Sequence, residues 1–320
     1  MKKKLSLILA LVMIAGIVLT SCGGAASKMT MGTGGVQGTY YAFGGVLGQY
    51  IKNNAGVDVN VVSTDGSKAN IQGIDIGDYQ LATVQSDVMA YAWAGTNSFA
   101  EEGALQSFRV IGGLYAEAVQ LVTMDPAIKS VADLKGKNVS IGAPGSGVYF
   151  NAIDVLAAAG LTEEDINAQY QSFGDSTEAL KDGKIDAAFI VAGAPTPAIT
   201  ELATTTDAYL VPIDGDIAAN VMANCPYYTV VTIPAGTYPK QEADVQTVTV
   251  KATLIVSASA DENAVYEITK AIFDNTSAIA AEHVKGAELS LENATSGMTA
   301  PFHKGAAKYF TEKGITVTAE

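Results

Sequence analysis

The stretch Gly32-Thr33-Gly34-Gly35-Val36-Gln37-Gly38-Thr39-Tyr40-Tyr41 joins a short apolar run, Met29 to Met31, to an amphipathic segment. The apolar residues of that segment recur at the spacing of one helix face, at Tyr40, Phe43, Leu47 and Ile51. Thr39 is placed to cap the first turn of this helix. The stretch therefore predicts a strand, a tight glycine loop and a helix.

The glycine loop is a candidate anion site. Glycines let the backbone approach a ligand closely, and a helix start leaves unpaired N–H groups at the positive end of its dipole. The spacing is not the dinucleotide fingerprint, because Gln37 stands where its third glycine belongs, and the chain has no G-x-x-x-x-G-K-[ST] phosphate loop. A purely structural turn between strand and helix fits the same residues, so the loop alone does not decide the function.

The first 21 residues have the pattern of a lipoprotein signal peptide. Lys2 to Lys4 precede the apolar run Leu5 to Leu19, which is short for a transmembrane helix. The run ends in Leu19-Thr20-Ser21-Cys22, which resembles the bacterial lipoprotein processing box. We expect export, lipid attachment at Cys22 and a flexible tether over residues 22–28. An ordinary cleavage site with a chance cysteine is the alternative.

The composition predicts an acidic globular protein. The chain of 320 residues has a formal net charge of −14, and removal of the leader takes three lysines away. Such a surface argues against nucleic acid and against electrostatic adhesion to anionic lipid. About 300 mature residues suffice for one large or two ordinary domains. With Cys22 lipidated, Cys225 is expected to be a buried thiol outside any disulfide.

Beyond the first helix the chain alternates strand-like and helix-like segments, which is typical of a parallel sheet with crossover helices. We expect strands over residues 57–62, 80–84, 109–114 and 118–123, and helices over 67–76 and from residue 86 onward. Ser86 follows a strand end. It either caps the next helix or faces a ligand, because open α/β sheets bind ligands at the carboxyl ends of their strands.

A second block repeats this pattern. A strand over 138–141 leads into the glycine loop 143–147 and a helix that stops at Gly160. A helix over 175–182 and a strand over 185–191 follow, and Pro195 and Pro197 are placed to start another helix. Two blocks with glycine loops at their strand ends predict two lobes that face one ligand cleft.

The last third reads as strands over 209–211, 226–232 and 248–257, a loop over 233–247, and helices over 263–273 and 302–310. The tail is expected to return to the first lobe. Lobe 1 is therefore assigned to residues 29–117 with 250–320, and lobe 2 to residues 118–249.

Six segments in register resemble the TAXI family, the extracytoplasmic solute receptors of TRAP (tripartite ATP-independent periplasmic) transporters. The segments are Gly32-Thr33-Gly34-Gly35 with Tyr40-Tyr41, Val84-Gln85-Ser86-Asp87, Asp133-Leu134-Lys135-Gly136-Lys137, Pro144-Gly145-Ser146-Gly147, Val191-Ala192-Gly193-Ala194-Pro195, and Ile233-Pro234-Ala235-Gly236-Thr237-Tyr238. The chain departs from the family at Ala116 and Ala143, where prolines are common, and at Lys68, where an apolar residue is usual.

The resemblance implies an α/β fold of the periplasmic-binding-protein type II, with two lobes, each a mostly parallel sheet flanked by helices. It implies a non-enzymatic receptor, acting as a monomer, that closes on a small anionic solute such as an amino acid or a dicarboxylate, glutamate or 2-oxoglutarate for example. The receptor would deliver the solute to TRAP membrane permease subunits and would touch the membrane only through its lipid.

Recognition is expected to rest on neutral donors. Arg109 is the only arginine of the chain, and we interpret it as a strand-end surface charge. Backbone N–H groups, hydroxyls and the Gln85 amide suit a carboxylate without a full countercharge. Of Tyr40 and Tyr41, one is expected in the core and one in the cleft. The candidate ligand-binding residues are Thr33, Gly34, Gly35, Thr39, Tyr40, Tyr41, Gln85, Ser86, Ser146, Gly147, Gly193, Ala194 and Tyr227.

Two alternatives stay open. The first is the substrate-binding lipoprotein of an ABC-type importer, which shares the two-lobed plan. The second is an extracytoplasmic hydrolase, which the chain supports poorly: Ser146 lacks the flanking glycines of a nucleophile elbow, and His283 and His303 have no metal-ligand spacing. No metal and no cofactor are expected.

Overall fold

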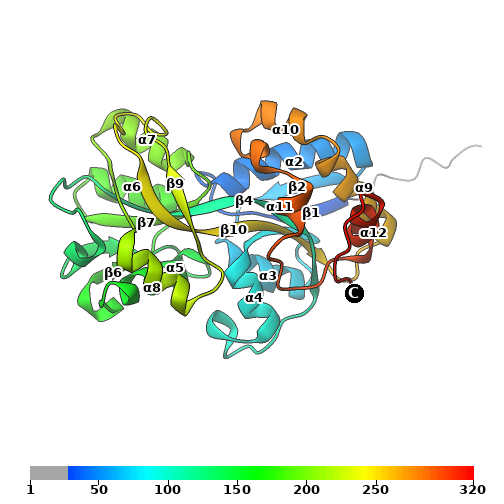
Figure 1. Cartoon of the computed structure of the whole chain (residues 1–320), viewed down its shortest axis with the longest axis horizontal. Coiled ribbons are helices and arrows are strands. Elements are labelled where there is room, and N and C mark those ends of the chain that lie inside the picture. Colours follow the sequence, from blue (N-terminus) through cyan, green and yellow to red (C-terminus); the bar gives the residue numbers. More distant parts are fainter. Residues whose placement is uncertain (1–27) are drawn as a thin grey trace, which may run out of the picture.

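The computed structural model describes residues 28–320, and Figure 1 shows that they form two halves joined by two long strands. The predicted signal peptide, the lipidation site Cys22 and all but the last residue of the tether lie outside the described residues. Within residues 28–320, no helix is long and apolar enough to cross a membrane.

The described residues build one mixed sheet, in the order β2-β1-β3-β10-β4-β7-β5-β6, with β8 paired to β4 and β9 paired to β10. The strands are β1 (Lys28–Gly32), β2 (Asp58–Val62), β3 (Leu81–Gln85), β4 (Phe108–Thr123), β5 (Asn138–Ser140), β6 (Asn167–Gln169), β7 (Ala187–Ala192), β8 (Tyr209–Val211), β9 (Thr229–Ile233) and β10 (Val245–Ser257). The helices are α2 (Thr39–Ala55), α3 (Ser67–Asp75), α4 (Ser86–Ala94), α5 (Val148–Ala158), α6 (Phe173–Lys181), α7 (Pro197–Thr205), α8 (Gly215–Asn224), α9 (Glu262–Phe273), α10 (Thr276–Glu282), α11 (Leu291–Thr295) and α12 (Lys304–Glu312). Short 3₁₀ turns are η1 (Asn97–Phe99), η2 (Val131–Leu134), η3 (Glu163–Asp165) and η4 (Val284–Glu288).

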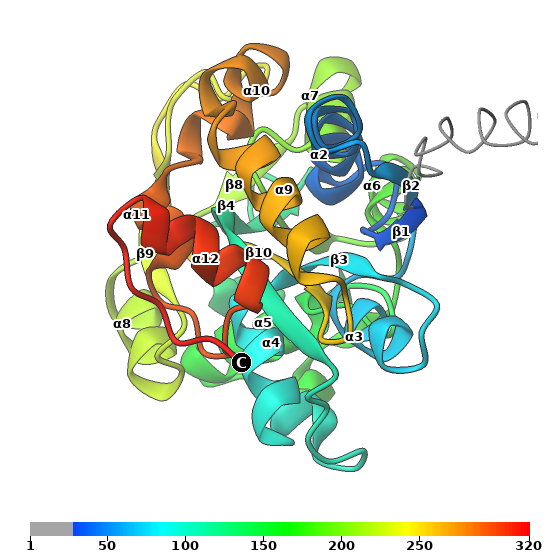
Figure 2. The ribbon, with the colours of Figure 1, turned by 90° about the vertical axis from the view of Figure 1, so that its right-hand side faces the viewer.

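In the first lobe, β1 pairs in parallel with β2 and β3 because the crossover helices α2 and α3 return the chain to the same edge. The predicted apolar face of α2 is buried, and the helix ends at Gly56, whose φ of 68° is the left-handed conformation that glycine adopts freely. Figure 2 shows α9 between α2 and α12 on one side of this lobe. The C-terminal segment therefore returns to the first lobe, as we expected.

In the second lobe, β5 pairs in parallel with β6 and β7, and α5 and α6 are the crossovers. Helix α7 begins with Pro197 in its first turn, as the two prolines indicate. Each lobe thus contains a parallel set of three strands, and the antiparallel strands β4 and β10 make the whole sheet mixed. The mostly parallel character that we predicted holds within these two sets.

Strands β4 and β10 cross from one lobe to the other (Figure 1). Residues Phe108–Ala118 of β4 pair with β10, and residues 118–123 pair with β7. The prediction of two separate strands, 109–114 and 118–123, was wrong, because the intervening residues continue the pairing and Glu117 is buried in it. Glu117 therefore lies where β4 leaves its pairing with β10 and joins β7.

Several shorter elements differ from the prediction. Helices α8, α10 and α11 were not predicted, since α8 buries only Ala218 and Val221 and α10 buries only Ile279, which is too little for a clear periodic pattern. Thr39 and Ser86 are not N-caps: Gly38 and Gln85 hold those positions, and neither makes a side-chain cap hydrogen bond.

Candidate functional site

A cavity of about 80 Å³ lies between the two lobes. Its walls come from the segments that follow β1, β2, β5 and β6, from the carboxyl ends of β3 and β7, and from Glu117 of β4. This is the edge at which open α/β sheets bind ligands. The lining residues are Gly34, Gly35, Gly38, Thr39, Tyr40, Thr64, Asp65, Gly66, Ser67, Gln85, Glu117, Ala143, Ser146, Gly147, Val148, Gln171, Ser172, Phe173, Val191 and Ala192.

Helix starts from both lobes meet at this cavity. Residues at the first turns of α2, α3, α5 and α6 all line it, represented by Thr39, Ser67, Val148 and Phe173. The first N–H groups of a helix have no intrahelical acceptor and lie at the positive end of its dipole. The positive dipole ends of these four helices therefore meet at the cavity, although in α3 the N–H groups of Lys68 and Ala69 bond to Gly145.

The two lobes contact each other around the cavity. Thr39 Oγ1 donates a hydrogen bond of 2.8 Å to the carbonyl of Gly193 in the second lobe. The backbone N–H groups of Lys68 and Ala69 both donate to the carbonyl of Gly145, at 3.1 and 3.2 Å. Gly147 packs so closely on Gln85 that an added β-carbon would lie 1.4 Å from Gln85 Oε1. The structure thus has the lobes closed on each other.

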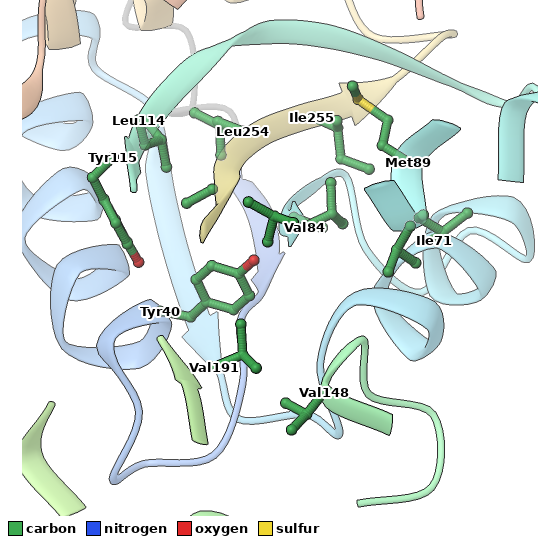
Figure 3. Packing of buried hydrophobic residues seen from close by; sticks show 14 of the residues in the cluster. Tyr40, Ile71, Val84, Met89, Leu114, Tyr115, Val148, Val191, Leu254 and Ile255 are labelled. Carbon is green, nitrogen blue, oxygen red and sulfur yellow. The ribbon is translucent and has the colours of Figure 1, made fainter. Parts of the chain in front are cut away.

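Glu117 is the buried acid of the cavity, with an exposed fraction of 2%. The Tyr40 hydroxyl donates to Glu117 Oε2 at 2.5 Å. Burial raises the pKa of Glu117 to about 8, although the bond from Tyr40 and the charge of Lys285 act in the opposite direction. Figure 3 shows Tyr40 next to Val191 of the second lobe, and both line the cavity with Val148. Tyr40 is thus the cleft tyrosine, and it is buried, whereas Tyr41 lies on the outer face with 36% exposure.

A buried polar chain behind the cavity fixes the orientation of Gln85. Asn151 Nδ2 donates to Asp87 Oδ2 and to the Tyr228 hydroxyl, so Asn151 Oδ1 accepts from Gln85 Nε2 at 2.7 Å. Burial raises the pKa of Asp87 to about 6, which leaves its carboxyl largely ionised at neutral pH and able to accept from Asn151. Gln85 Oε1 then has no hydrogen-bond partner among the described residues.

Most donors that we expected to bind an anion are used by the protein itself. Thr33 Oγ1 donates to the carbonyl of Val62, Thr39 Oγ1 to Gly193, and Gln85 Nε2 to Asn151. Ser86 Oγ accepts a bond from the backbone N–H of Lys251. Of the predicted side-chain donors, Ser146 Oγ has no hydrogen-bond partner among residues 28–320 and lines the cavity.

The structure brings together part of the predicted site. Seven candidates line the cavity: Gly34, Gly35, Thr39, Tyr40, Gln85, Ser146 and Gly147. Six others do not line it: Thr33, Tyr41, Ser86, Gly193, Ala194 and Tyr227. Ser86 and Tyr227 line a separate hollow with Lys251 and Glu288. Arg109 binds Glu320 and stacks on Trp93, and Lys68 binds Glu102, so neither side chain lines the cavity.

Sequence reasoning missed the acidic and amide groups of the cavity. Asp65, Glu117 and Gln171 line it, and no lysine, arginine or histidine does so within residues 28–320. One signal for Glu117 was available, because it is the only acidic residue in the largely apolar run Phe108–Thr123. A single carboxylate within a buried strand is costly and needs a reason.

Solved structures share this fold. The alkanesulfonate-binding protein SsuA from Xanthomonas axonopodis pv. citri, bound to MOPS, matches with a TM-score of 0.52 at 16% identity, over 90% of this chain and 91% of that one. A putative L-cystine ABC transporter protein from Listeria monocytogenes matches at 0.52 and 15% identity, over 82% and 98%. An ABC uptake transporter substrate-binding protein from Streptococcus pneumoniae with bound histidine matches at 0.50 and 16%, over 80% and 91%.

These likenesses confirm the predicted fold class, a two-lobed α/β fold like that of the periplasmic binding proteins. The family model that matches this chain is not a TAXI model. That model is described as NMT1-like and covers residues 31–314, so this chain belongs to the NMT1-like family.

Proposed function

We propose that this chain is the solute-binding receptor of an importer, and that it acts outside the cytoplasm on a small organic acid. The observation that carries the proposal is the cavity between the lobes at which four helix starts meet. Backbone N–H groups at helix starts bind carboxylate, phosphate or sulfonate oxygens without a cationic side chain.

As the membrane partner we propose an ABC-type importer. Structural neighbours with this fold include proteins whose descriptions name ABC transporters, one of them with bound histidine. The TAXI-like order of sequence segments favours a TRAP permease, which is the second candidate. ATP-dependent uptake of the bound solute into membrane vesicles supports the ABC partner, and uptake driven by an ion gradient without ATP supports the TRAP partner.

We further propose that the mature protein is a monomer anchored through lipid on Cys22, and that the lobe boundaries fall at residues 117/118 and 249/250. The change of strand partner at Ala118 supports the first of these boundaries. The binding residues that we propose are the seven predicted candidates that line the cavity, with Glu117 added.

The test is mass spectrometry of small molecules released when the purified protein is denatured, followed by titration calorimetry with the compound identified. We expect a stoichiometric organic acid, released unchanged. Arg109→Gln is the control variant, since this side chain lies outside the cavity, and it should bind as the parent does. Turnover of esters or peptides, or abolished binding in the Arg109 variant, contradicts the proposal.

A further inference from the structure

The cavity contains acceptors that a simple anion cannot use. Besides the helix starts, its lining includes the carboxyl groups of Asp65 and Glu117 and the amides of Gln85 and Gln171. Gln85 Oε1 and Gln171 Oε1 have no hydrogen-bond partner among the described residues. Gln85 is 2% exposed, and its neighbours fix which atom of its amide is free. Both oxygens are shielded from the cavity space, and Gln85 Oε1 lies against Gly147, so the acceptor that a ligand can reach is the Glu117 carboxyl.

One carboxylate oxygen of Glu117, Oε1, has no hydrogen-bond donor among the described residues. Tyr40 is its only hydrogen-bonding side chain within residues 28–320, and it engages Oε2 alone. Lys285, the cation whose charge acts on Glu117, is bound to Glu288 at 2.7 Å and lies over the Tyr115 ring, so Glu117 has no ion-pair partner within residues 28–320. A buried carboxylate normally has a paired charge or a bound proton.

We infer that Glu117 is a specificity-determining residue that binds a protonated nitrogen of the ligand, while the helix starts bind its acid group. The inference rests on the proposed function and narrows its solute class to small organic acids that also carry an ammonium or similar nitrogen. A charged donor on Glu117 supplies the missing partner.

Binding of a cationic nitrogen changes the protonation of Glu117. In the empty closed protein Glu117 carries a proton at neutral pH, because burial raises its pKa to about 8. When the ligand nitrogen arrives with its own positive charge, the carboxyl proton leaves to solvent and an ion pair remains. The charged and titratable groups that surround Glu117 are Tyr40 of α2, Tyr115 of β4, Asp87 of α4, and Lys285 of η4, besides Asp65 across the cavity. Binding to the closed empty form should therefore release a proton at pH 7, and the affinity of that form should rise as the pH increases toward 8.

The experiment is titration calorimetry with matched pairs of probes that differ only in the nitrogen: L-glutamate against 2-oxoglutarate, and L-alanine against pyruvate. The solute identified by mass spectrometry is added to the panel with its deaminated analogue. The proteins are the parent, Glu117→Gln and the control Glu282→Gln, which makes the same change on the exposed α10. Measurements at pH 7 in two buffers of different ionisation enthalpy give the number of protons released.

For each pair of probes that binds, we expect the parent and the control to bind the amino acid at least about tenfold more tightly than its oxo analogue. Glu117→Gln should lose this preference and the proton release. Equal affinity within each pair, tighter binding of the oxo acid, or a preference retained in Glu117→Gln overturns the inference while the receptor assignment stands. If no small molecule binds to any protein in any arm, the proposed function itself fails, and the inference fails with it.

Discussion

Replacement of Glu117 by glutamine should make the empty protein more stable at neutral and alkaline pH. Glutamine has the shape of glutamic acid and can still accept the hydrogen bond from Tyr40, but it has no charge to lose on burial. The folded protein raises the pKa of the Glu117 carboxyl from 4.5 to about 8 through burial. The folded chain therefore holds a proton that the unfolded chain releases.

The sign and size of the stability difference between the parent and Glu117→Gln follow from that difference in proton binding. Because the folded pKa is raised, the contribution of this group is fully present below pH 4.5 and is lost progressively as the pH increases to about 8. Each pH unit in the interval corresponds to about 1.4 kcal/mol. The parent thus loses about 3 kcal/mol by pH 7 and about 5 kcal/mol by pH 8 relative to a neutral side chain. These values are ceilings, because water can reach the carboxylate when the lobes part.

The assay is denaturation by urea of the ligand-free parent and variant at pH 5, 7 and 8.5, with Glu282→Gln as the matched control. We expect the free energy of unfolding of Glu117→Gln to exceed that of the parent by an amount that grows with pH. The difference between Glu282→Gln and the parent should be the same at every pH. A variant that is less stable than the parent by the same amount at every pH would refute the reasoning, because it would show Glu117 to be an ordinary ionised structural residue.

Three further predictions concern closure and anchoring. Gly147→Ala should hinder closure, since its β-carbon would meet Gln85 Oε1 and Val88 Cγ2, whereas Gly45→Ala, on α2 outside the cavity, has nothing within 4 Å and should bind as the parent does. Overpacking costs about 1 to 3 kcal/mol, so calorimetry should show a roughly fivefold to hundredfold loss of affinity for Gly147→Ala, and equal affinity in both variants contradicts this. Saturation with the identified solute should lower the radius of gyration in small-angle scattering, and an unchanged radius means that the lobes do not move. Cys22→Ser should yield a protein that no longer partitions into detergent; continued partitioning as a lipoprotein rules out the anchor.

The fold could be predicted largely from local signals. The glycine loop before α2, the face carrying Phe43 and Leu47, and the alternation of strands and helices all correspond to observed elements. What failed was the local prediction for β4: it divided the strand at residues 115–117, and only the pairing with β10 and β7 shows that the strand continues. Tertiary context decides such cases.

The site could be predicted in position but not in chemistry. Residues at strand ends were found because the fold class dictates where loops gather. The partners of hydroxyl groups could not be found, because the Thr33 and Thr39 hydroxyls bond to carbonyls at Val62 and Gly193, which are remote in sequence. The excess of acceptors over donors is likewise a property of the assembled cavity, since Gln85, Glu117 and Gln171 come from three different segments.

Glu117 links the stability of the protein to its proposed function. In the closed empty form it must bind a proton or remain a buried unpaired charge, and both disfavour closure at neutral pH. When the lobes part, water solvates the carboxylate and the penalty falls. A ligand nitrogen removes the same penalty in the closed form, so the ligand stabilises the closed form more than the open one. A ligand shifts a conformational equilibrium only through such a difference in affinity. A carboxyl on the strand that crosses between the lobes is well placed to couple solute recognition to closure.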